Sequence, residues 1–201
     1  MLKVLVACEY SGRVRDAFAR MGHFAMSCDL LPSDAPGHHY TGSVLDVIDH
    51  EWDLMIAHPP CTYLSNAGAR WLYAGKVLNA GRFEQGLDAK TFFLTLLNAN
   101  IPRIAIENPV PSSVFELPKY SQTIQPYEFG HPFKKKTCLW LKNLPELIPT
   151  NVIPEGERES TKIPGNWFNK GGKDRQKERA RTFQGIADAM ANQWGALNAD
   201  S

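Results

Sequence analysis

The sequence predicts an α/β fold in which a mostly parallel β-sheet carries helices on both faces. Two observations lead to this prediction. Short apolar runs, which are typical of buried strands, alternate with segments of helical periodicity through the first half of the 201-residue chain. The second half changes to short β-like runs separated by proline and glycine, which indicates an antiparallel hairpin at the edge of the sheet.

The apolar runs predict five strands in the parallel part of the sheet. They are expected at residues 4–8, 24–28, 40–44, 54–57 and 104–106. The first run is apolar throughout, which is typical of a central strand buried on both faces. Helices are expected over 13–21 and 82–98, because apolar residues recur there at three- and four-residue spacing. Gly22 then ends the first helix.

The remaining segments are expected to complete a single domain over residues 1–201. Residues 121–125 and 137–141 are the two strands of the predicted hairpin. Residues 65–81 are less regular and are interpreted as a mobile loop or short helix over the site. Few large apolar residues occur within 151–177, which indicates a flexible, loop-rich surface segment. A last helix over 179–197 is expected to dock on the sheet.

Composition narrows the class of protein. The formal net charge is +1, and the four cysteines stand far apart with no Cys-x-x-Cys pair. This spacing argues against a zinc site and a disulfide framework, and it favours a reducing compartment. No apolar run approaches the roughly 18 residues of a membrane span. We therefore expect a soluble, cytoplasmic protein without a bound metal.

Two motifs about one strand–helix unit apart predict an active site. Cys61 follows two prolines directly after the run 54–57, and Glu107 ends a second apolar run. Because the carboxyl ends of neighbouring parallel strands face one crevice, we expect the thiol and the carboxyl to meet there. A thiolate that adds to carbon 6 of cytosine makes carbon 5 nucleophilic, and a carboxyl can hydrogen-bond the ring nitrogen and amine. The alternatives are an inert buried cysteine and a carboxyl that, with Asn108, only caps a turn.

A second group of residues predicts a cofactor pocket beside that crevice. Ser11 and Gly12 form the turn between the first strand and the first helix, where backbone N–H groups bind electronegative ligands. Asp29 ends the second strand, where a carboxylate often binds a ribose hydroxyl. Asp46 follows the third and is a candidate for an adenine amine. The turn lacks the Gly-x-Gly-x-x-Gly pattern of a dinucleotide site, and each residue alone is also typical of a loop cap.

Over roughly residues 1–115 the chain resembles the DNA cytosine carbon-5 methyltransferases. The motifs that carry the resemblance are, in order, Tyr10-Ser11-Gly12, Asp29, Asp46, Pro59-Pro60-Cys61 and Glu107-Asn108. The resemblance implies a Rossmann-like methyltransferase fold with S-adenosylmethionine as cofactor. It assigns Cys61 to attack cytosine carbon 6 and Glu107, beside Asn108, to engage the ring. It places Tyr10, Ser11, Gly12 and Pro60 on the cofactor, with Asp29 near its ribose and Asp46 near its adenine.

The second half departs from that family's pattern. Lys134-Lys135-Lys136 stands where the family has a Gln-x-Arg-x-Arg element, and we expect Lys134 and Lys136 to bind phosphate without the bidentate contacts of arginine. Residues 182–194 resemble the closing motif that returns to the cofactor pocket. The family's large target-recognition domain is missing, as in compact phage and prophage proteins of this type. We therefore expect little sequence preference, or a partner chain that supplies target recognition.

These observations predict a methyltransferase that acts on carbon 5 of cytosine in DNA through a covalent cysteine adduct. Duplex DNA would present a flipped-out base, and Trp71 and Tyr73 are either packing residues or candidates to fill the gap or stack on a base. Two alternatives stay open. The first is the same chemistry on a free pyrimidine nucleotide or RNA, and the second is a DNA- or partner-binding module or decoy with little turnover. Binding to DNA would weaken steeply with salt, whereas binding to a mononucleotide would not.

Overall fold

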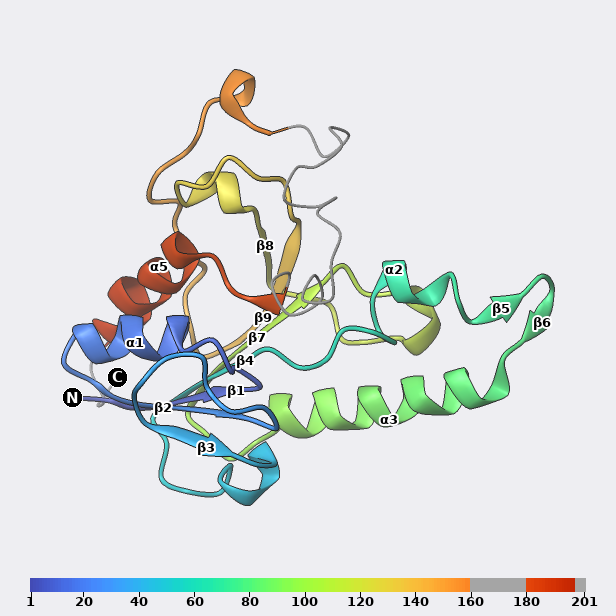
Figure 1. Ribbon diagram of the computed structural model, residues 1–201, viewed down its shortest axis with the longest axis horizontal. Coiled ribbons are helices and arrows are strands. Elements are labelled where there is room, and N and C mark those ends of the chain that lie inside the picture. Colours follow the sequence, from blue (N-terminus) through green and yellow to red (C-terminus); the bar gives the residue numbers. More distant parts are fainter. Residues whose placement is uncertain (160–179, 198–201) are drawn as a thin grey trace.

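The computed structural model describes residues 1–159 and 180–197. Its centre is a seven-stranded sheet with the order β3-β2-β1-β4-β7-β9-β8 (Figure 1). The strands are β1 (Lys3–Ala7), β2 (Phe24–Asp29), β3 (His39–Thr41), β4 (Leu54–Ala57), β7 (Arg103–Pro109), β8 (Gln122–Ile124) and β9 (Thr137–Lys142), and a separate hairpin contains β5 (Tyr73–Ala74) and β6 (Val77–Leu78). The helices are α1 (Arg13–Arg20), α2 (Asn66–Ala69), α3 (Ala80–Leu97) and α5 (Gln184–Gly195), with short 3₁₀ turns η1 (Val44–Asp46), η2 (Ser113–Phe115), η3 (Pro126–Glu128) and η4 (Glu155–Glu157).

The pairing of the strands confirms a mostly parallel sheet with an antiparallel hairpin at one edge. The strands from β3 to β7 pair in parallel, and β9 is antiparallel to both β7 and β8. The third strand is shorter than predicted and ends at Thr41. After it, the Ser43 hydroxyl accepts a hydrogen bond from the N–H of Leu45, which caps η1 and replaces the end of the expected strand with a turn.

Helices cover both faces of the sheet, as predicted. The side chains of β1 alternate between two apolar layers: Val4 and Val6 pack with α1 and α5, whereas Leu5 and Ala7 pack with α3. All four are fully buried, and burying a valine or leucine side chain stabilises a fold by about 1.5–3 kcal/mol. Figure 1 shows α1 and α5 side by side, with α3 separate from them.

The order of the strands reverses at β1, and this reversal positions the site. The chain runs outward from β1 to β2 and β3, then crosses to β4 on the other side of β1 and continues to β7. In open parallel sheets, ligands bind in the crevice outside the carboxyl ends of the strands at such a point. The fold therefore places the loops after β1 and β4 at a ligand-binding position.

Two of the predicted irregular segments have different outcomes. Residues 65–81 contain the short helix α2, as one of the expected alternatives, and also the β5–β6 hairpin, which the sequence did not predict. The hairpin extends at one end of the molecule in Figure 1, and Gly75 turns the chain between its strands with φ +63°. Most of the predicted flexible segment 151–177 lies outside the described residues. Within residues 1–159 and 180–197, every helix is too short or too polar to serve as a membrane span.

Candidate active site

A cavity of about 420 Å³ opens where β1, β2 and β4 end. Its walls are Cys8, Glu9, Tyr10 and Ser11 after β1, Asp29 and Leu31 after β2, His58 and Pro60 after β4, and Ala180, Arg181 and Thr182 before α5. This volume lies within the usual range of small-molecule sites. The structure thus brings the predicted Tyr10, Ser11, Asp29 and Pro60 to one cavity, whereas Gly12 is not among its lining residues.

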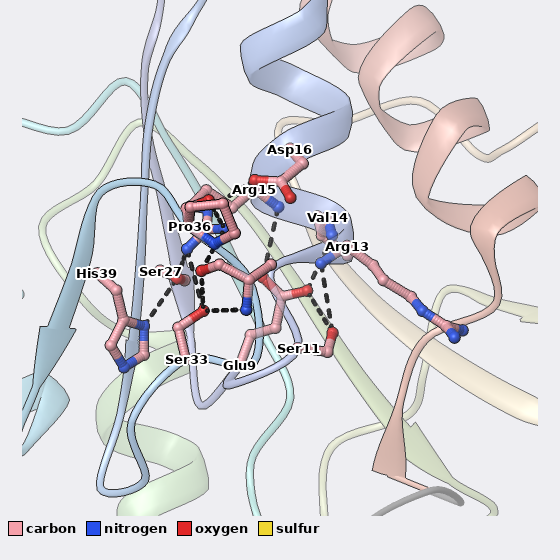
Figure 2. A network of polar contacts seen from close by, with 11 residues as sticks. Glu9, Ser11, Arg13, Val14, Arg15, Asp16, Ser27, Ser33, Pro36 and His39 are labelled. Atoms are coloured by element: carbon pink, nitrogen blue, oxygen red, sulfur yellow. Dashed lines mark hydrogen bonds and ion pairs between the residues drawn. The ribbon is translucent and has the colours of Figure 1, made fainter.

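The side chain of Glu9 stabilises the turn between β1 and α1 (Figure 2). Its buried carboxylate accepts hydrogen bonds from the N–H of Val14 at 2.8 Å, the N–H of Arg15 at 3.3 Å and the Ser11 hydroxyl at 3.0 Å. Gly12, at the start of the helix, has φ +75°, which favours glycine. The sequence predicted that this helix end would offer its amides to a ligand. Instead, the backbone N–H groups of Val14 and Arg15 donate hydrogen bonds to the carboxylate of Glu9.

Arg15 fixes the loop that follows β2 (Figure 2). Its side chain is 1% exposed and pairs with Asp16 at 2.8 Å. The guanidinium also donates to the Ser33 hydroxyl at 3.2 Å and to the carbonyl oxygen of Pro36 at 2.8 Å. These bonds tie the loop to α1. The loop carries Leu31 to the cavity, so Arg15 shapes that wall without reaching it.

The two predicted cofactor carboxylates lie in different surroundings. Asp29 ends β2, lines the cavity and accepts a hydrogen bond from the N–H of Leu31 at 2.9 Å. Asp46 is exposed in η1 and accepts a hydrogen bond of 3.1 Å from Tyr40, a bond that raises the pKa of Tyr40. Asp46 is not among the residues that line the cavity. Neither aspartate belongs to a metal-binding group, since residues 1–159 and 180–197 contain no suitable cluster of three or more His, Cys, Asp or Glu side chains.

The Pro-Pro-Cys and Glu-Asn motifs lie side by side at the ends of adjacent parallel strands. Because β4 pairs in parallel with β7, His58, directly after β4, lies level with Glu107, which is still within β7. The Nδ1 atom of His58 lies 2.9 Å from Oε2 of Glu107. One residue further along each segment, the Nδ2 amide of Asn108 donates to the carbonyl oxygen of Pro59 at 3.2 Å. Two side-chain contacts thus link the motifs.

His58 and Glu107 form a buried ion pair whose side chains are 10% and 14% exposed. Burial alone would raise the pKa of Glu107, but the hydrogen bond and charge of His58 outweigh it. With the charge of Lys135 and a 3.4 Å hydrogen bond from Thr182, they lower the pKa from 4.5 to about 2. Burial also acts to lower the pKa of His58. The hydrogen bond and charge of Glu107, helped by the charge of Glu9, reverse this effect and raise that pKa.

The two cysteines near the crevice differ in their chemistry. Cys61 is half-buried and directly follows Pro60, which lines the cavity. Cys8 lines the cavity itself, but burial, together with the charge of Asp29, raises the pKa of Cys8 to about 12. Cys8 is therefore protonated at neutral pH. Since a thiolate is the nucleophilic form, Cys61 is the better candidate of the two.

A basic side chain of α3 supports the loop that carries Cys61. The guanidinium of Arg82 donates to the carbonyl oxygens of Thr62 at 3.2 Å and Gly68 at 3.3 Å. It also lies 5.0 Å from the centroid of the Tyr63 ring. The loop after the candidate nucleophile is thus held from the neighbouring helix.

The lysine run before β9 reaches the site through its middle residue. Lys134 and Lys136 are exposed. Lys135 is half-buried, lies 5.8 Å from the centroid of the Phe183 ring, and acts electrostatically on Glu107. The sequence predicted Lys134 and Lys136 as substrate-binding residues, whereas it is the charge of Lys135 that lowers the pKa of the candidate carboxyl.

The sequence interpretation assigned no role to Glu9 or His58, and it included Thr182 only as the first residue of the segment that resembles the closing motif. Glu9 and His58 each stand one or two residues after an apolar run, so their position directly after a strand was an available signal. Thr182 comes from the segment before α5, far from Glu107 in sequence. Its backbone carbonyl oxygen accepts a 2.9 Å hydrogen bond from Arg13 of α1, which holds the segment against the first turn. No local signal marks that contact.

Comparisons with known proteins give similarities to solved structures alone. No family model matches the chain, and no curated protein does. Among solved structures, the chain is similar to a candidate DNA modification methyltransferase encoded within an E. coli prophage, with 15% sequence identity and a TM-score of 0.46. The match covers 77% of this chain and 52% of that one, so the chain spans about half the length of that protein. A similarity of this size does not by itself identify an activity.

Proposed function

We propose that the chain is an S-adenosylmethionine-dependent methyltransferase that acts on carbon 5 of cytosine in DNA, with Cys61 as the nucleophile. The observation that supports this most strongly is the union of two motifs at one crevice. Asn108 donates a hydrogen bond to the carbonyl oxygen of Pro59, and Glu107 pairs with His58. These two contacts join the loop that carries Cys61 to the strand that carries Glu107. A nucleophile and a carboxyl are the two groups that addition to a cytosine ring requires.

The proposed reaction begins when the Cys61 thiolate forms a bond to carbon 6. The electrons of the 5,6 double bond move into the ring, and ring nitrogen N3 takes up a proton. In the described part of the chain, both side-chain contacts of Glu107 are made to Oε2, which leaves Oε1 to hydrogen-bond N3. Carbon 5 would then take the methyl group, with S-adenosylhomocysteine as the leaving group. The proton of carbon 5 leaves to water, the thiolate departs as the 5,6 double bond re-forms, and N3 gives up the proton that it took up.

The cavity suits a nucleoside cofactor with a positively charged sulfur. Asp29 stands at the end of β2, where carboxylates bind ribose hydroxyls. Asp29 and Glu9 make part of the wall acidic, which favours a sulfonium cation, and Tyr10 and Pro60 add larger apolar surface. S-adenosylmethionine would supply an electrophilic methyl group there. Asp46 has no place in this binding mode, because it lies outside the cavity walls.

The segment after Cys61 favours DNA as the substrate. Residues 62–83 contain no aspartate or glutamate but include the basic Arg70, Lys76 and Arg82. Trp71 and Tyr73 are 60% and 51% exposed, and the guanidinium of Arg70 lies 4.9 Å from the centroid of the Trp71 ring. Exposed aromatic and cationic side chains stack on bases and neutralise phosphates. The segment, which includes the β5–β6 hairpin, is therefore a candidate DNA contact.

Nucleoside mass spectrometry with isotopically labelled S-adenosylmethionine tests the proposal. We expect labelled 5-methylcytosine in DNA and none after Cys61→Ala, while Cys28→Ala, a fully buried thiol outside the cavity walls, keeps its activity. RNA and deoxycytidine monophosphate are assayed in parallel. Label only in these substrates would favour the nucleotide or RNA alternative. Absence of label despite DNA binding would favour a binding module.

A further inference from the structure

We propose that His58 acts through Glu107, as the store of the proton that the cytosine ring takes up when Cys61 adds to it. This inference rests on the proposed function and adds to it a positioning residue. His58 is neither the proposed nucleophile nor the proposed carboxyl of the site.

The geometry places His58 against one of the two oxygens of the Glu107 carboxylate. Nδ1 of His58 lies 2.9 Å from Oε2 of Glu107, and the Thr182 hydroxyl donates to the same oxygen at 3.4 Å. His58 directly follows β4, while Glu107 lies within the adjacent β7. Oε2 is thus held from two sides, and Oε1 is the oxygen that remains for a substrate. A proton that Oε2 takes up from His58 can reach a substrate once the neutral carboxyl group turns about its Cγ–Cδ bond.

The other ring nitrogen indicates that His58 is more than a structural support. Nε2 is buried and has no hydrogen-bond partner within residues 1–159 and 180–197. Buried polar atoms of a folded protein are nearly always paired, because an unpaired one destabilises the fold. An imidazole that served only to support the fold would be expected to bond through both nitrogens. His58 instead lines the cavity with one nitrogen unbonded.

Charged groups from the surrounding elements decide where the proton of the pair resides. Glu107 on β7 and Glu9 on the β1–α1 turn favour the imidazolium, whereas Lys135, before β9, and burial oppose it. The net effect raises the pKa of His58, and the pKa of Glu107 falls to about 2. At neutral pH the pair therefore favours an imidazolium beside a carboxylate. A ring that needs a proton must then obtain it from His58 by way of Glu107.

The proton count balances over the reaction. As Cys61 adds to carbon 6, Nδ1 of His58 gives its proton to the Glu107 carboxylate, and the neutral carboxyl group that results gives this proton to N3. The pair changes from imidazolium and carboxylate to neutral imidazole and carboxylate. When the thiolate departs, N3 returns its proton through Glu107 to His58. The carbon 5 proton leaves separately to water, so no other reactant is needed.

The first test measures the pH dependence of kcat for DNA methylation in the wild type, His58→Gln and His50→Gln. Glutamine keeps a hydrogen-bond donor beside Glu107 but cannot hold the proton, and His50 is an exposed histidine outside the site. We expect His58→Gln to lower kcat about 100-fold, at the low end of general acid–base effects, with KM for DNA changed less than about threefold. The wild type and His50→Gln should lose activity at alkaline pH as His58 deprotonates, and His58→Gln should lack this limb. An unchanged kcat and pH profile would overturn the role of His58.

A second test applies to the wild type itself, should His58→Gln fold poorly. Nuclear magnetic resonance of ¹⁵N-histidine-labelled protein should show His58 protonated at pH 7. In Glu107→Gln the pKa of His58 should fall. A neutral His58 at pH 7 would overturn this inference alone. Failure of the wild type to form 5-methylcytosine in DNA would overturn the proposed function, and the role of His58 with it.

Discussion

Asn108 donates a hydrogen bond from its side chain to the carbonyl oxygen of Pro59, 3.2 Å away. The bond joins β7 to the loop that carries Cys61, and the donor is only 1% exposed. A nucleophile has to be held within a fraction of an ångström of its working position. Asn108 therefore holds the loop from β7, and Arg82 holds it from α3.

Replacing Asn108 with alanine should lower both stability and activity. The carbonyl oxygen of Pro59 would lose its partner in a buried setting, which costs about 1–3 kcal/mol in free energy of unfolding. Denaturant unfolding measures this loss, and kcat for methylation should fall because the loop loses a fixed point. Asn192→Ala, at an exposed side chain of α5 that bonds only to Asp188 of its own helix, should cost far less. Equal losses for the two variants would contradict the role of Asn108.

Alkylation should distinguish Cys61 from the other thiols. Burial, as the largest cause, raises the pKa of Cys8 to about 12 and that of Cys28 to about 11, and it also raises the pKa of Cys138. Each pH unit below a thiol's pKa reduces its thiolate about tenfold, so Cys8 is about one part in ten thousand thiolate at pH 8. Iodoacetamide followed by peptide mass spectrometry should therefore label Cys61 first. Earlier labelling of Cys8 would contradict this order.

The ion pair between His58 and Glu107 should make the free energy of unfolding depend on pH. The folded pKa of Glu107 is depressed, so its contribution is complete above about 4.5 and is lost as the pH falls towards 2. The folded pKa of His58 is raised, so its contribution is complete below about 6.5 and is lost as the pH rises through the folded value. The pair should therefore stabilise the fold most between about pH 4.5 and 6.5.

Glu107→Gln tests this window. The fall in pKa corresponds to about 3 kcal/mol at this 14%-exposed side chain, as an order of magnitude. Denaturant unfolding should show the largest difference from the wild type near pH 5–6 and a smaller one near pH 2–3. Glu84→Gln, at an exposed position of α3, should follow the wild-type curve. A difference that stays constant with pH would mean that Glu107 is not ionised in the fold.

Removing the exposed rings next to the β5–β6 hairpin should weaken DNA binding without unfolding the protein. Stacking of a base on an aromatic ring contributes about 1–3 kcal/mol, so Trp71→Ala with Tyr73→Ala should raise Kd for DNA about tenfold or more in fluorescence anisotropy. Ile148→Ala with Val152→Ala, at positions 70% and 56% exposed elsewhere on the chain, provides the control. Equal affinities for the two double variants would exclude the hairpin region as a DNA contact.

The fold could be predicted where apolar runs are short and continuous. Residues 4–7 and 54–57 are buried on both faces of the sheet, and their sequences contain little else than apolar residues. The predicted end of β3 was wrong because a hydrogen bond between the Ser43 hydroxyl and the N–H of Leu45 stabilises a turn where the sequence pattern indicated a strand. The β5–β6 hairpin was missed because each strand has only two residues, which is too short for an alternating pattern to appear.

The site could be predicted only in part, for a physical reason. Cys61 follows β4 and Glu107 lies in the last part of β7, and the parallel pairing of these strands brings the segments of the two motifs together. The electrostatics of the crevice depend on Lys135 and Thr182, which approach from the antiparallel edge and from the segment before α5. Such contacts depend on tertiary packing rather than on neighbouring residues. The same reason explains why the sequence favoured Lys134 and Lys136 in the lysine run.

Covalent trapping on DNA that contains 5-fluorocytosine tests the proposed chemistry most directly. Fluorine cannot leave carbon 5 as a cation, so an enzyme that adds to carbon 6 and transfers a methyl group remains bound to the DNA. With S-adenosylmethionine present, we predict an adduct of protein and DNA that peptide mass spectrometry maps to Cys61 and that Cys61→Ser does not form. Methylation of cytosine in DNA by Cys61→Ser, or the lack of any adduct on DNA that the wild type binds, would contradict the mechanism.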